Sequence, residues 1–394
     1  MKEWKEYKIS DVCSISSSKR IFANEYKLSG IPFYRGKEII EKQKGSNVSN
    51  ELFISEKRFL EIKNKFGSPM EGDMLLTSVG TLGVPYIVKQ NEVFYFKDGN
   101  LTWFYDFKNI NNRYLYYWFL SPVAKHYIDT KAIGSTQKAL TIETLKGFNI
   151  SLPSIDTQNK IVEILSSLDD KIELNRRIND NLEQQVQLMF DKTFVNYPAT
   201  NFCRLSDIAN INPKRIISKN TKARYIEMSN LPTKGSFPCK WEYKDYNGGM
   251  KFTNGDTIMA RITPCLENGK VAYINFLDKG EISFGSTEYI VISSKGTYRP
   301  EWFYFLTRNK LFIDYSIKHM NGSSGRQRVS GESIGDFQIP LFSMDSLQPL
   351  FTMSEIALKT ITRNSLENIK LSAIRDFVLP KLMSGELKIN EINN

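Results

Sequence analysis

The segment LTIETLKGFNISLPSIDT (140–157) returns 189 residues later as VSGESIGDFQIPLFSMDS (329–346). The identical pairs include Glu143/Glu332, Phe148/Phe337, Ile150/Ile339, Ser154/Ser343 and Asp156/Asp345. Self-similarity of this extent indicates a structural unit that occurs twice. The Ser and Asp residues near the end of each copy can accept hydrogen bonds from the first free amides of a helix. Each copy is therefore predicted to lead into a helix.

Two earlier segments also occur twice. KISDVCSI (8–15) matches RLSDIANI (204–211) at an offset of 196, and GDMLL (72–76) matches GDTIM (255–259) at an offset of 183. Gly-Asp followed by an apolar run is typical of a turn that leads into a buried strand. Because the offset changes along the chain, the two copies share one frame but differ in loop length.

The residues after each repeat have apolar side chains at alternating steps of four and three, which is the seam of a coiled coil. Pro198 and Pro380 are expected to end these two helices. Neither would be stable alone, so we expect them to pair in antiparallel orientation. Asn175 and Asn364 are equivalent by the repeat; they either fix the register of the pair or are two hydrated side chains in a loose stretch. The predicted seam comprises Leu165, Leu168, Ile172, Asn175, Leu182, Asn364, Leu371 and Ile374.

The predicted fold class is α+β, with two similar mixed α/β domains separated by two long antiparallel helices, related by a pseudo-two-fold internal repeat. The expected boundaries are 1–153 for the first domain, 154–197 for the first long helix, 198–342 for the second domain, 343–380 for the second long helix and 381–394 for a tail. The strand candidates are 75–78, 86–88, 93–96, 257–261, 271–274 and 289–292.

Composition points to nucleic acid as the first partner to test. Among the 394 residues, 53 Lys and Arg outnumber 43 Asp and Glu, which leaves a net charge of +10. That sign suits replacement of counterions along a phosphate backbone, although it also serves solubility alone. The opening MKEWKEYKIS lacks the apolar core of a secretory signal, and the run YLYYWFL (114–120) is far shorter than the roughly 20 residues of a membrane span. We therefore expect a cytoplasmic protein with no membrane segment and with reduced, partly buried cysteines.

Motifs for DNA-modifying chemistry are missing from the sequence. It contains no G-x-x-x-x-G-K-[ST] loop, no [DN]-P-P-[YFW] motif and no Pro-Asp pair of a nuclease. We therefore expect no catalytic residue and no metal site in this chain. Two alternatives stay open: a coiled-coil scaffold without direct DNA contact, and a cryptic DNA methyltransferase or nuclease.

Two glycine-containing loops at nearly the same place in the repeat are the main candidates for DNA contact. They are GSTQKAL (134–140) and GSSGRQRVS (322–330). Glutamine can read adenine, arginine can read guanine, and lysine suits phosphate. The loop candidates are Gly134, Ser135, Thr136, Gln137, Lys138, Gly325, Arg326, Gln327 and Arg328. Weaker candidates, each equally consistent with a solvated surface charge, are Lys19, Arg20, Arg35, Lys37, Lys214, Arg215, Arg261 and Lys270.

The combined motifs resemble those of the specificity (S) subunit of type I restriction-modification systems, over nearly the whole chain. The resemblance rests on the openings at 4–15 and 202–211, the Gly-Asp turns, the G-S-x-Q-x-x-L element at 134–140, the helix entries PSIDTQNKI (153–161) and PLFSMDSLQPL (340–350), and LPKLMSGEL (379–387). The second loop departs from the first, with GRQR (325–328) in place of STQK (135–138).

The resemblance implies a non-catalytic subunit with two target-recognition domains. Each domain would bind one half of a split double-stranded DNA target, and the long helices would set the gap. Two modification (M) subunits would methylate adenine with S-adenosylmethionine, and restriction (R) subunits would use ATP and Mg, so these cofactors would belong to the partners. Two linked readers gain specificity by binding together. We expect an added helical segment near 190–197 to change the gap and to leave both half-sequences intact.

Overall fold

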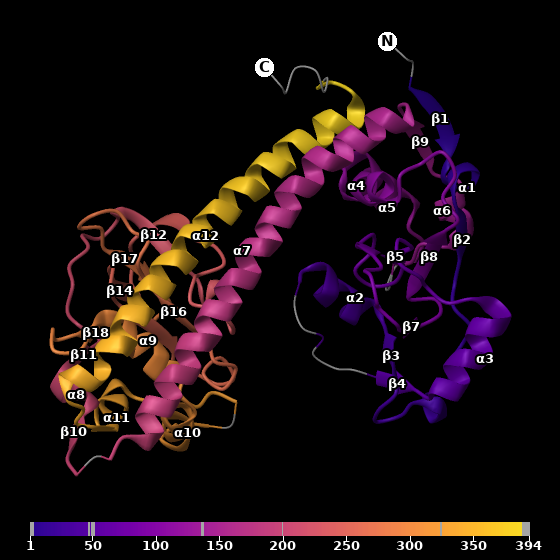
Figure 1. Cartoon of the computed structure of the whole chain (residues 1–394). Helices are drawn as coiled ribbons and strands as arrows, with labels where there is room; N and C mark the ends of the chain where they lie inside the picture. The colour runs from indigo at the N-terminus through magenta and orange to yellow at the C-terminus, as the bar shows by residue number, and fades with distance from the viewer. Residues whose placement is uncertain are drawn as a thin grey trace. The chain divides into compact units, whose positions relative to one another are not determined.

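The computed structural model describes residues 4–45, 48, 52–134, 138–198, 200–323 and 325–387. The chain divides into two compact units: residues 1–171 with 371–394 form unit 1, and residues 172–370 form unit 2 (Figure 1). Both unit boundaries fall inside a long helix. These helices are α7 (Ile155–Asn196) and α12 (Met344–Ser384).

Unit 1 is a mixed helix and strand domain whose main sheet has the strand order β2-β8-β5-β6. A smaller sheet has the order β4-β3-β7, and β1 pairs with β9. The strands are β1 (Lys5–Lys8), β2 (Ser14–Ser16), β3 (Ile31–Tyr34), β4 (Leu52–Ile54), β5 (Met74–Thr77), β6 (Pro85–Ile87), β7 (Tyr95–Phe96), β8 (Leu101–Tyr105) and β9 (Asn149–Leu152). The helices are α1 (Ile9–Val12), η1 (Ala23–Glu25), α2 (Gly36–Gln43), α3 (Glu56–Phe66), α4 (Asn112–Leu120), α5 (Pro122–Lys131) and α6 (Ile142–Lys146).

Unit 2 repeats this plan. Its main sheet has the order β11-β18-β15-β16, its second sheet the order β13-β12-β17-β14, and β10 pairs with β19. The strands are β10 (Phe202–Arg204), β11 (Ala209–Ile211), β12 (Lys222–Ile226), β13 (Glu242–Asp245), β14 (Met250–Phe252), β15 (Thr257–Ala260), β16 (Val271–Tyr273), β17 (Ser283–Gly285), β18 (Tyr289–Ser294) and β19 (Gln338–Pro340). The helices are α8 (Leu205–Ile208), η2 (Met228–Asn230), α9 (Pro300–Arg308), α10 (Lys310–Lys318) and α11 (Gly331–Gly335).

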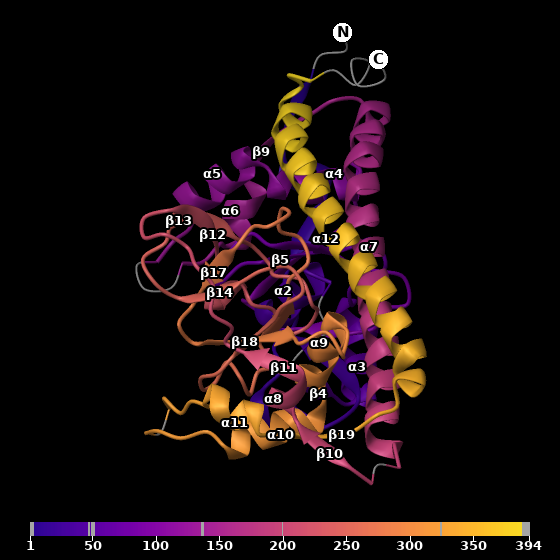
Figure 2. The same cartoon turned by 90° about the vertical axis from the view of Figure 1, so that its left-hand side faces the viewer.

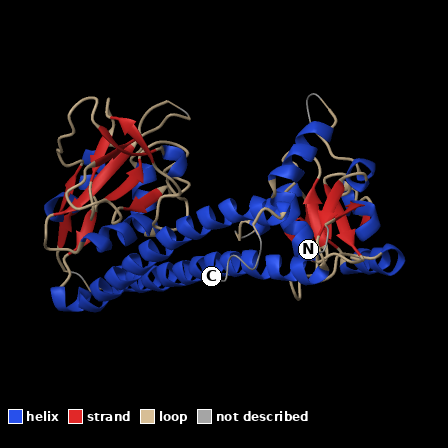
Figure 3. Cartoon of the chain, turned by 90° about the horizontal axis from the view of Figure 1, so that it is seen from above, coloured by secondary structure: helices blue, strands red, loops and turns tan. Residues whose placement is uncertain are grey.

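The repeated sequence segments form equivalent elements. Thr141 caps α6 by accepting the Thr144 amide at 3.1 Å, and Ser330 caps α11 by accepting the Ser333 amide at 2.9 Å. The Gly-Asp turns before β5 and β15 also match, since Gly72 and Gly255 both have positive φ, 86° and 88°. A residue with a Cβ is strained there, which explains the glycine. In Figure 3 the strands of each unit gather into sheets with helices around them.

The six predicted strands all overlap observed ones, but the units are not identical. Helices α2 and α3 lie in unit 1 between β3 and β7, whereas unit 2 has η2, β13 and β14 between β12 and β17. The parallel pair β3·β7 nevertheless corresponds to the parallel pair β12·β17. The largest difference in elements therefore lies in the connection after β3 and β12, before the Gly-Asp turns at which the sequence offset has fallen to 183.

Helices α7 and α12 run antiparallel within each unit, as predicted. In unit 2 the Asn175 and Asn364 side chains are both buried, which excludes the hydrated alternative. Asn175 donates to Asn368 at 2.8 Å, and Asn364 donates to Asn179 at 2.9 Å. Figures 1 and 2 show α7 and α12 side by side.

These four asparagines form a pseudo-symmetric set, which we name the asparagine quartet. The offset of 189 that relates the repeats takes Asn175 to Asn364 and Asn179 to Asn368. The bond between Asn175 and Asn368 is therefore equivalent by the repeat to the bond between Asn364 and Asn179. A buried polar group must find a partner, so such pairs favour one register over sliding alternatives.

Most of the other predicted seam residues are shielded from solvent, with one exception. Leu165 and Ile172 are buried, and Leu168, Leu182 and Leu371 are half-buried. Ile374 is 49% exposed, so its assignment to the seam was wrong. The neighbouring residue, Arg375, instead forms an ion pair with Asp169 of α7 at 2.8 Å, and the buried apolar positions resume only at Leu379.

The second long helix also continues to Ser384, past Pro380 where it was expected to end. A proline inside a helix costs about 3 kcal/mol. Leu379, Leu382 and Met383 are buried in the unit 1 core, and burial of one such side chain contributes about 1.5–3 kcal/mol. Packing therefore offsets the cost and extends the helix.

The segment 190–197, where an insertion was expected to change only the gap, also contributes to the unit 2 core. Phe190 and Phe194 are buried in the unit 2 core, where both rings lie close to Trp302. Added residues there would displace these rings instead of only lengthening a spacer.

Candidate nucleic-acid interface

In unit 1 the first predicted loop folds back onto the end of β5. The Leu140 amide donates to the Ser78 carbonyl at 2.9 Å, and the Ser78 amide donates to the Asn100 carbonyl at 2.8 Å. Ala139 forms an isolated bridge with Val79. We name residues 78–80, 100, 133–134 and 138–140 the Gly-rich edge of unit 1. The residues Ser135, Thr136 and Gln137 lie outside the described part of the chain.

The second predicted loop makes the same bonds in unit 2. The Val329 amide donates to the Arg261 carbonyl at 3.0 Å, and the Arg261 amide donates to the Glu288 carbonyl at 3.0 Å. Arg328 forms an isolated bridge with Ile262. Residues 261–263, 288, 321–323 and 325–329 are the Gly-rich edge of unit 2. The two loops are therefore one structural element, present twice.

Equivalent backbone bonds allow the side chains to be compared position by position. The equivalent pairs are Ser78/Arg261, Asn100/Glu288, Lys138/Gln327 and Ala139/Arg328. Unit 1 places small or neutral side chains at three of these positions, whereas unit 2 places two arginines and a carboxylate. The frame is shared and the chemistry presented on it differs, which is the arrangement expected of two readers with different targets.

The charged side chains of the unit 2 edge form one cluster. Arg328 donates from Nε and Nη2 to the Glu288 carboxylate, the latter at 2.8 Å, and from Nη1 to the Arg326 carbonyl at 3.0 Å. Hydrogen bonding from Arg328 lowers the pKa of Glu288. Arg261 places its Nε 3.9 Å from Glu288, within ion-pair range. One carboxylate therefore lies between two guanidinium groups.

The exposed loop side chains suit contact with a partner. Gly134 and Lys138 in unit 1, and Gly325 and Arg326 in unit 2, are exposed, whereas Gln327 is half-buried and its carbonyl accepts the Thr263 amide at 3.0 Å. Lysine and arginine in this setting can reach phosphate oxygens or base edges.

Lys19 and Arg20 lie close to the unit 1 edge through one loop. Arg20 pairs with Asp98 at 2.9 Å, two residues before Asn100 of the edge. The Lys19 amide donates to the buried Tyr95 hydroxyl at 2.7 Å, and its ammonium lies 4.5 Å from the centre of the Phe66 ring. Both side chains are exposed, so their predicted contact with DNA stays a prediction.

Three of the weaker candidates have partners within the chain, and their contact with DNA stays a prediction. Arg35 pairs with Glu38 at the start of α2. Arg215 is largely buried and pairs with Asp256 of the Gly-Asp turn at 2.8 Å. Lys270 donates to the Met228 carbonyl at 2.8 Å. Lys37 lies 3.8 Å from Glu41, and Lys214 is exposed.

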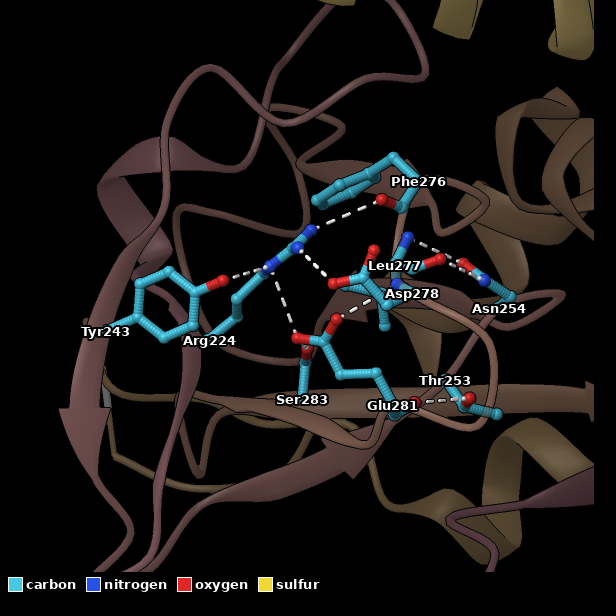
Figure 4. A network of polar contacts seen from close by, with 9 residues as sticks. All are labelled: Arg224, Tyr243, Thr253, Asn254, Phe276, Leu277, Asp278, Glu281 and Ser283. Atoms are coloured by element: carbon cyan, nitrogen blue, oxygen red, sulfur yellow. Dashed lines mark hydrogen bonds and ion pairs between the residues drawn. The ribbon is translucent and has the colours of Figure 1, made fainter.

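A second polar cluster in unit 2 has a structural role. Arg224 of β12 donates to the Tyr243 hydroxyl at 3.0 Å, to the Phe276 carbonyl at 3.2 Å and to Asp278 at 2.9 Å, and it pairs with Glu281 (Figure 4). All three guanidinium nitrogens are thus directed to neighbours, and only 13% of the side chain is exposed. This arginine holds the second sheet of unit 2, β13-β12-β17-β14, to the segment before β17.

Sequence reasoning missed Glu288. A lone glutamate in GSTEYI (285–290) carries no motif, and it gains significance only because β18 places it beside Arg328. The signal that could have indicated Glu288 was the equivalence of the strands that follow it and Asn100, β18 and β8.

No group of three or more metal-ligating side chains occurs among the described residues. Within that part of the chain, no helix combines the length and apolar character needed to cross a bilayer.

Comparisons with known proteins agree with this twofold arrangement. A family described as the type I restriction modification DNA specificity domain matches residues 1–184 and again residues 200–348. The chain belongs to this family, whose members recognise DNA targets in type I restriction-modification systems.

Relatives match nearly the whole chain. The type I restriction enzyme MjaIX specificity subunit of Methanocaldococcus jannaschii is 24% identical over 430 aligned positions, covering 99% of this chain and 95% of the relative. The HindI specificity subunit of Haemophilus influenzae is 21% identical over 474 positions, covering 98% of this chain and 100% of the relative. The crystal structure of a type I S subunit from M. genitalium has the same fold, with a TM-score of 0.61, 15% identity and 96% coverage of each chain.

Proposed function

We propose that this chain is the non-catalytic DNA-recognition subunit of a type I restriction-modification complex. Each unit reads one half of a bipartite double-stranded target, with its Gly-rich edge against the DNA. The observation that carries this proposal is the equivalence of the two edges, which are built on the same backbone bonds but present different side chains. Two Gly-rich edges with different side chains would recognise two different half-sequences.

The long helices supply the second part of the proposal. Antiparallel pairing through the asparagine quartet fixes the register of α7 against α12. A fixed register gives the target a fixed unspecified gap, because the second reader binds effectively as an intramolecular ligand once the first is bound. The helices also dock two M subunits, which methylate adenine with S-adenosylmethionine. R subunits that use ATP and Mg join the same complex, which works in the cytoplasm.

Two single substitutions test the assignment of one half-sequence to each unit. Lys138→Ala should weaken reading of one half only, and Arg326→Ala should weaken reading of the other half only. Each removes one exposed charge, so the slope of log affinity against log salt should fall by about 0.9 if that charge meets a phosphate. Binding is measured on random DNA libraries with the full chain and its M subunits, followed by sequencing of the selected DNA.

Lys310→Ala provides a matched control, since Lys310 is an exposed lysine on α10 that pairs with Asp314 at 3.2 Å. Its selected sequences and salt slope should match those of the unmodified complex. Equal damage to both halves by Lys138→Ala and by Arg326→Ala would contradict the proposal, as would selection of no sequence at all.

A further inference from the structure

The Arg328 guanidinium is held by its neighbours but not saturated by them. A guanidinium carries five N–H groups. The Nε group and one Nη2 group face Glu288, and one Nη1 group faces the Arg326 carbonyl. Within the described structure these bonds leave one N–H on each terminal nitrogen. The side chain is 38% exposed, so a partner can reach this remaining pair.

Two parallel N–H groups at the end of an arginine match one base in particular. Guanine presents O6 and N7 as adjacent acceptors in the major groove, and an arginine that meets both is the commonest specific contact with DNA. The flexible side chain loses rotamer entropy when it is ordered for such a contact. An arginine already fixed by a carboxylate loses less on binding, which favours the correct base more strongly.

Arg261 adds to this arrangement from the other side of Glu288. Its Nε is buried and has no hydrogen-bond partner among the described residues, although it lies within ion-pair range of the carboxylate. With one carboxylate between two arginines, the cluster keeps one net positive charge. Among the described residues no second acidic side chain pairs with either arginine, so this positive charge is available to an electronegative partner.

We infer that Glu288 is a positioning residue for base recognition, which holds Arg328 so that the open end of its guanidinium reads a guanine in the half-target of unit 2. The inference rests on the proposed function and deepens it. The equivalent positions in unit 1 are Asn100 and Ala139, so the same contact is absent from the half-target of unit 1. The two halves of the target therefore differ in how they are read at this position.

The test compares Glu288→Gln with Arg328→Ala in the full chain with its M subunits, by library selection and sequencing. The unmodified complex should require guanine at one position of one half. Arg328→Ala should lower that preference by about 5- to 100-fold, the range of one bidentate contact. Glu288→Gln should relax the same position by at least about fivefold while total affinity for DNA stays equal or rises, because a negative charge has been removed. A folding defect would instead lower affinity and blur the whole half-sequence.

Two further variants complete the design. Glu288→Asp keeps the charge but shortens the side chain by one methylene, so it should relax the same guanine position without a change in salt dependence. Glu242→Gln is the control: it removes a carboxylate of unit 2 that is also paired with a basic side chain, Lys244 at 2.6 Å, and it should leave the selected sequence unchanged. If the complex selects two half-sequences but Glu288→Gln and Glu288→Asp leave every position intact, the inference is wrong and the proposed function stands. If the unmodified complex selects none, the proposed function itself fails.

Discussion

The asparagine quartet predicts equal coupling in its two interhelical pairs, Asn175–Asn368 and Asn179–Asn364, which the repeat offset of 189 relates to each other. Replacing Asn175 with Ala removes its bond to Asn368 and a second bond, at 2.8 Å, to the carboxylate of Glu367. A neutral hydrogen bond contributes about 1 kcal/mol and one to a charged group about 1.5–3 kcal/mol. The opening free energy of the helix pair should therefore fall by about 3 kcal/mol in Asn175→Ala.

The coupling free energy between two bonded asparagines is a more specific test than the loss of stability in a single variant. A double-substitution cycle on Asn175 and Asn368 isolates the single bond between them, so it should give about 1 kcal/mol. The cycle on Asn364 and Asn179 should give the same value within about 0.5 kcal/mol, because its bond, at 2.9 Å, is the pseudo-symmetric equivalent.

Native-state hydrogen exchange on α7 and α12 measures both cycles, since it reports the free energy of local opening within unit 2. Asn181, an exposed asparagine of α7, provides the control: Asn181→Ala combined with Asn368→Ala should be additive. Coupling in one cycle and none in the other would refute the pseudo-symmetric account of the helix pair. Absence of coupling in both would show that the quartet does not set the register.

Two further predictions concern packing and thiol chemistry. Leu379→Ala should lower the free energy of local opening of α12, measured by hydrogen exchange, by about 2–5 kcal/mol, because Leu379 is buried. Ile374→Ala should lower it by less than about 1 kcal/mol, because half of that residue is exposed. Similar losses in both variants would contradict the removal of Ile374 from the seam. Burial raises the pKa of Cys13 to about 12, so the thiol is protonated at pH 8 and should resist alkylation until the protein unfolds, while the exposed Cys239 should react first; rapid labelling of Cys13 in the folded protein would contradict its burial.

The sequence predicted the architecture because its repeat is preserved where backbone geometry is demanding. Gly72 and Gly255 need positive φ, Thr141 and Ser330 cap equivalent helices, and these constraints keep residue types recognisable. The long helices were predictable for a similar reason, because burial of one face imposes a period on the sequence. The expected strands followed from apolar runs bounded by turns.

Contacts between distant segments were not predictable from local patterns. Ile374 continues the period of the seam, but the ion pair of Arg375 with Asp169 occupies the interface at that level. Arginine is usually exposed, so the sequence suggested that Arg215 lies on the surface. In the structure it is largely buried, because it forms an ion pair with the buried Asp256. Glu288 shows no local signal at all, and only the pairing of β15 with β18 places it near the second loop.

Different side chains on the same backbone structure would allow one fold to recognise two targets. The bonds that shape the Gly-rich edges come from the backbone, so side chains such as Ser78 and Arg261 can differ without loss of the loop conformation. A single substitution at an edge can then change the preferred base while the unit still folds. The second sheet of unit 2, to which Arg224 belongs, includes β13 and β14 from the connection where the units diverge most.

The central claim is that two separate readers on one chain recognise two separated half-sequences. Selection from a random double-stranded DNA library by the full chain with its M subunits measures this directly. We expect two short specified blocks separated by an unspecified gap of constant length, with each block altered only by substitutions in one unit. A single uninterrupted motif, or a gap that varies freely among selected molecules, would contradict the account.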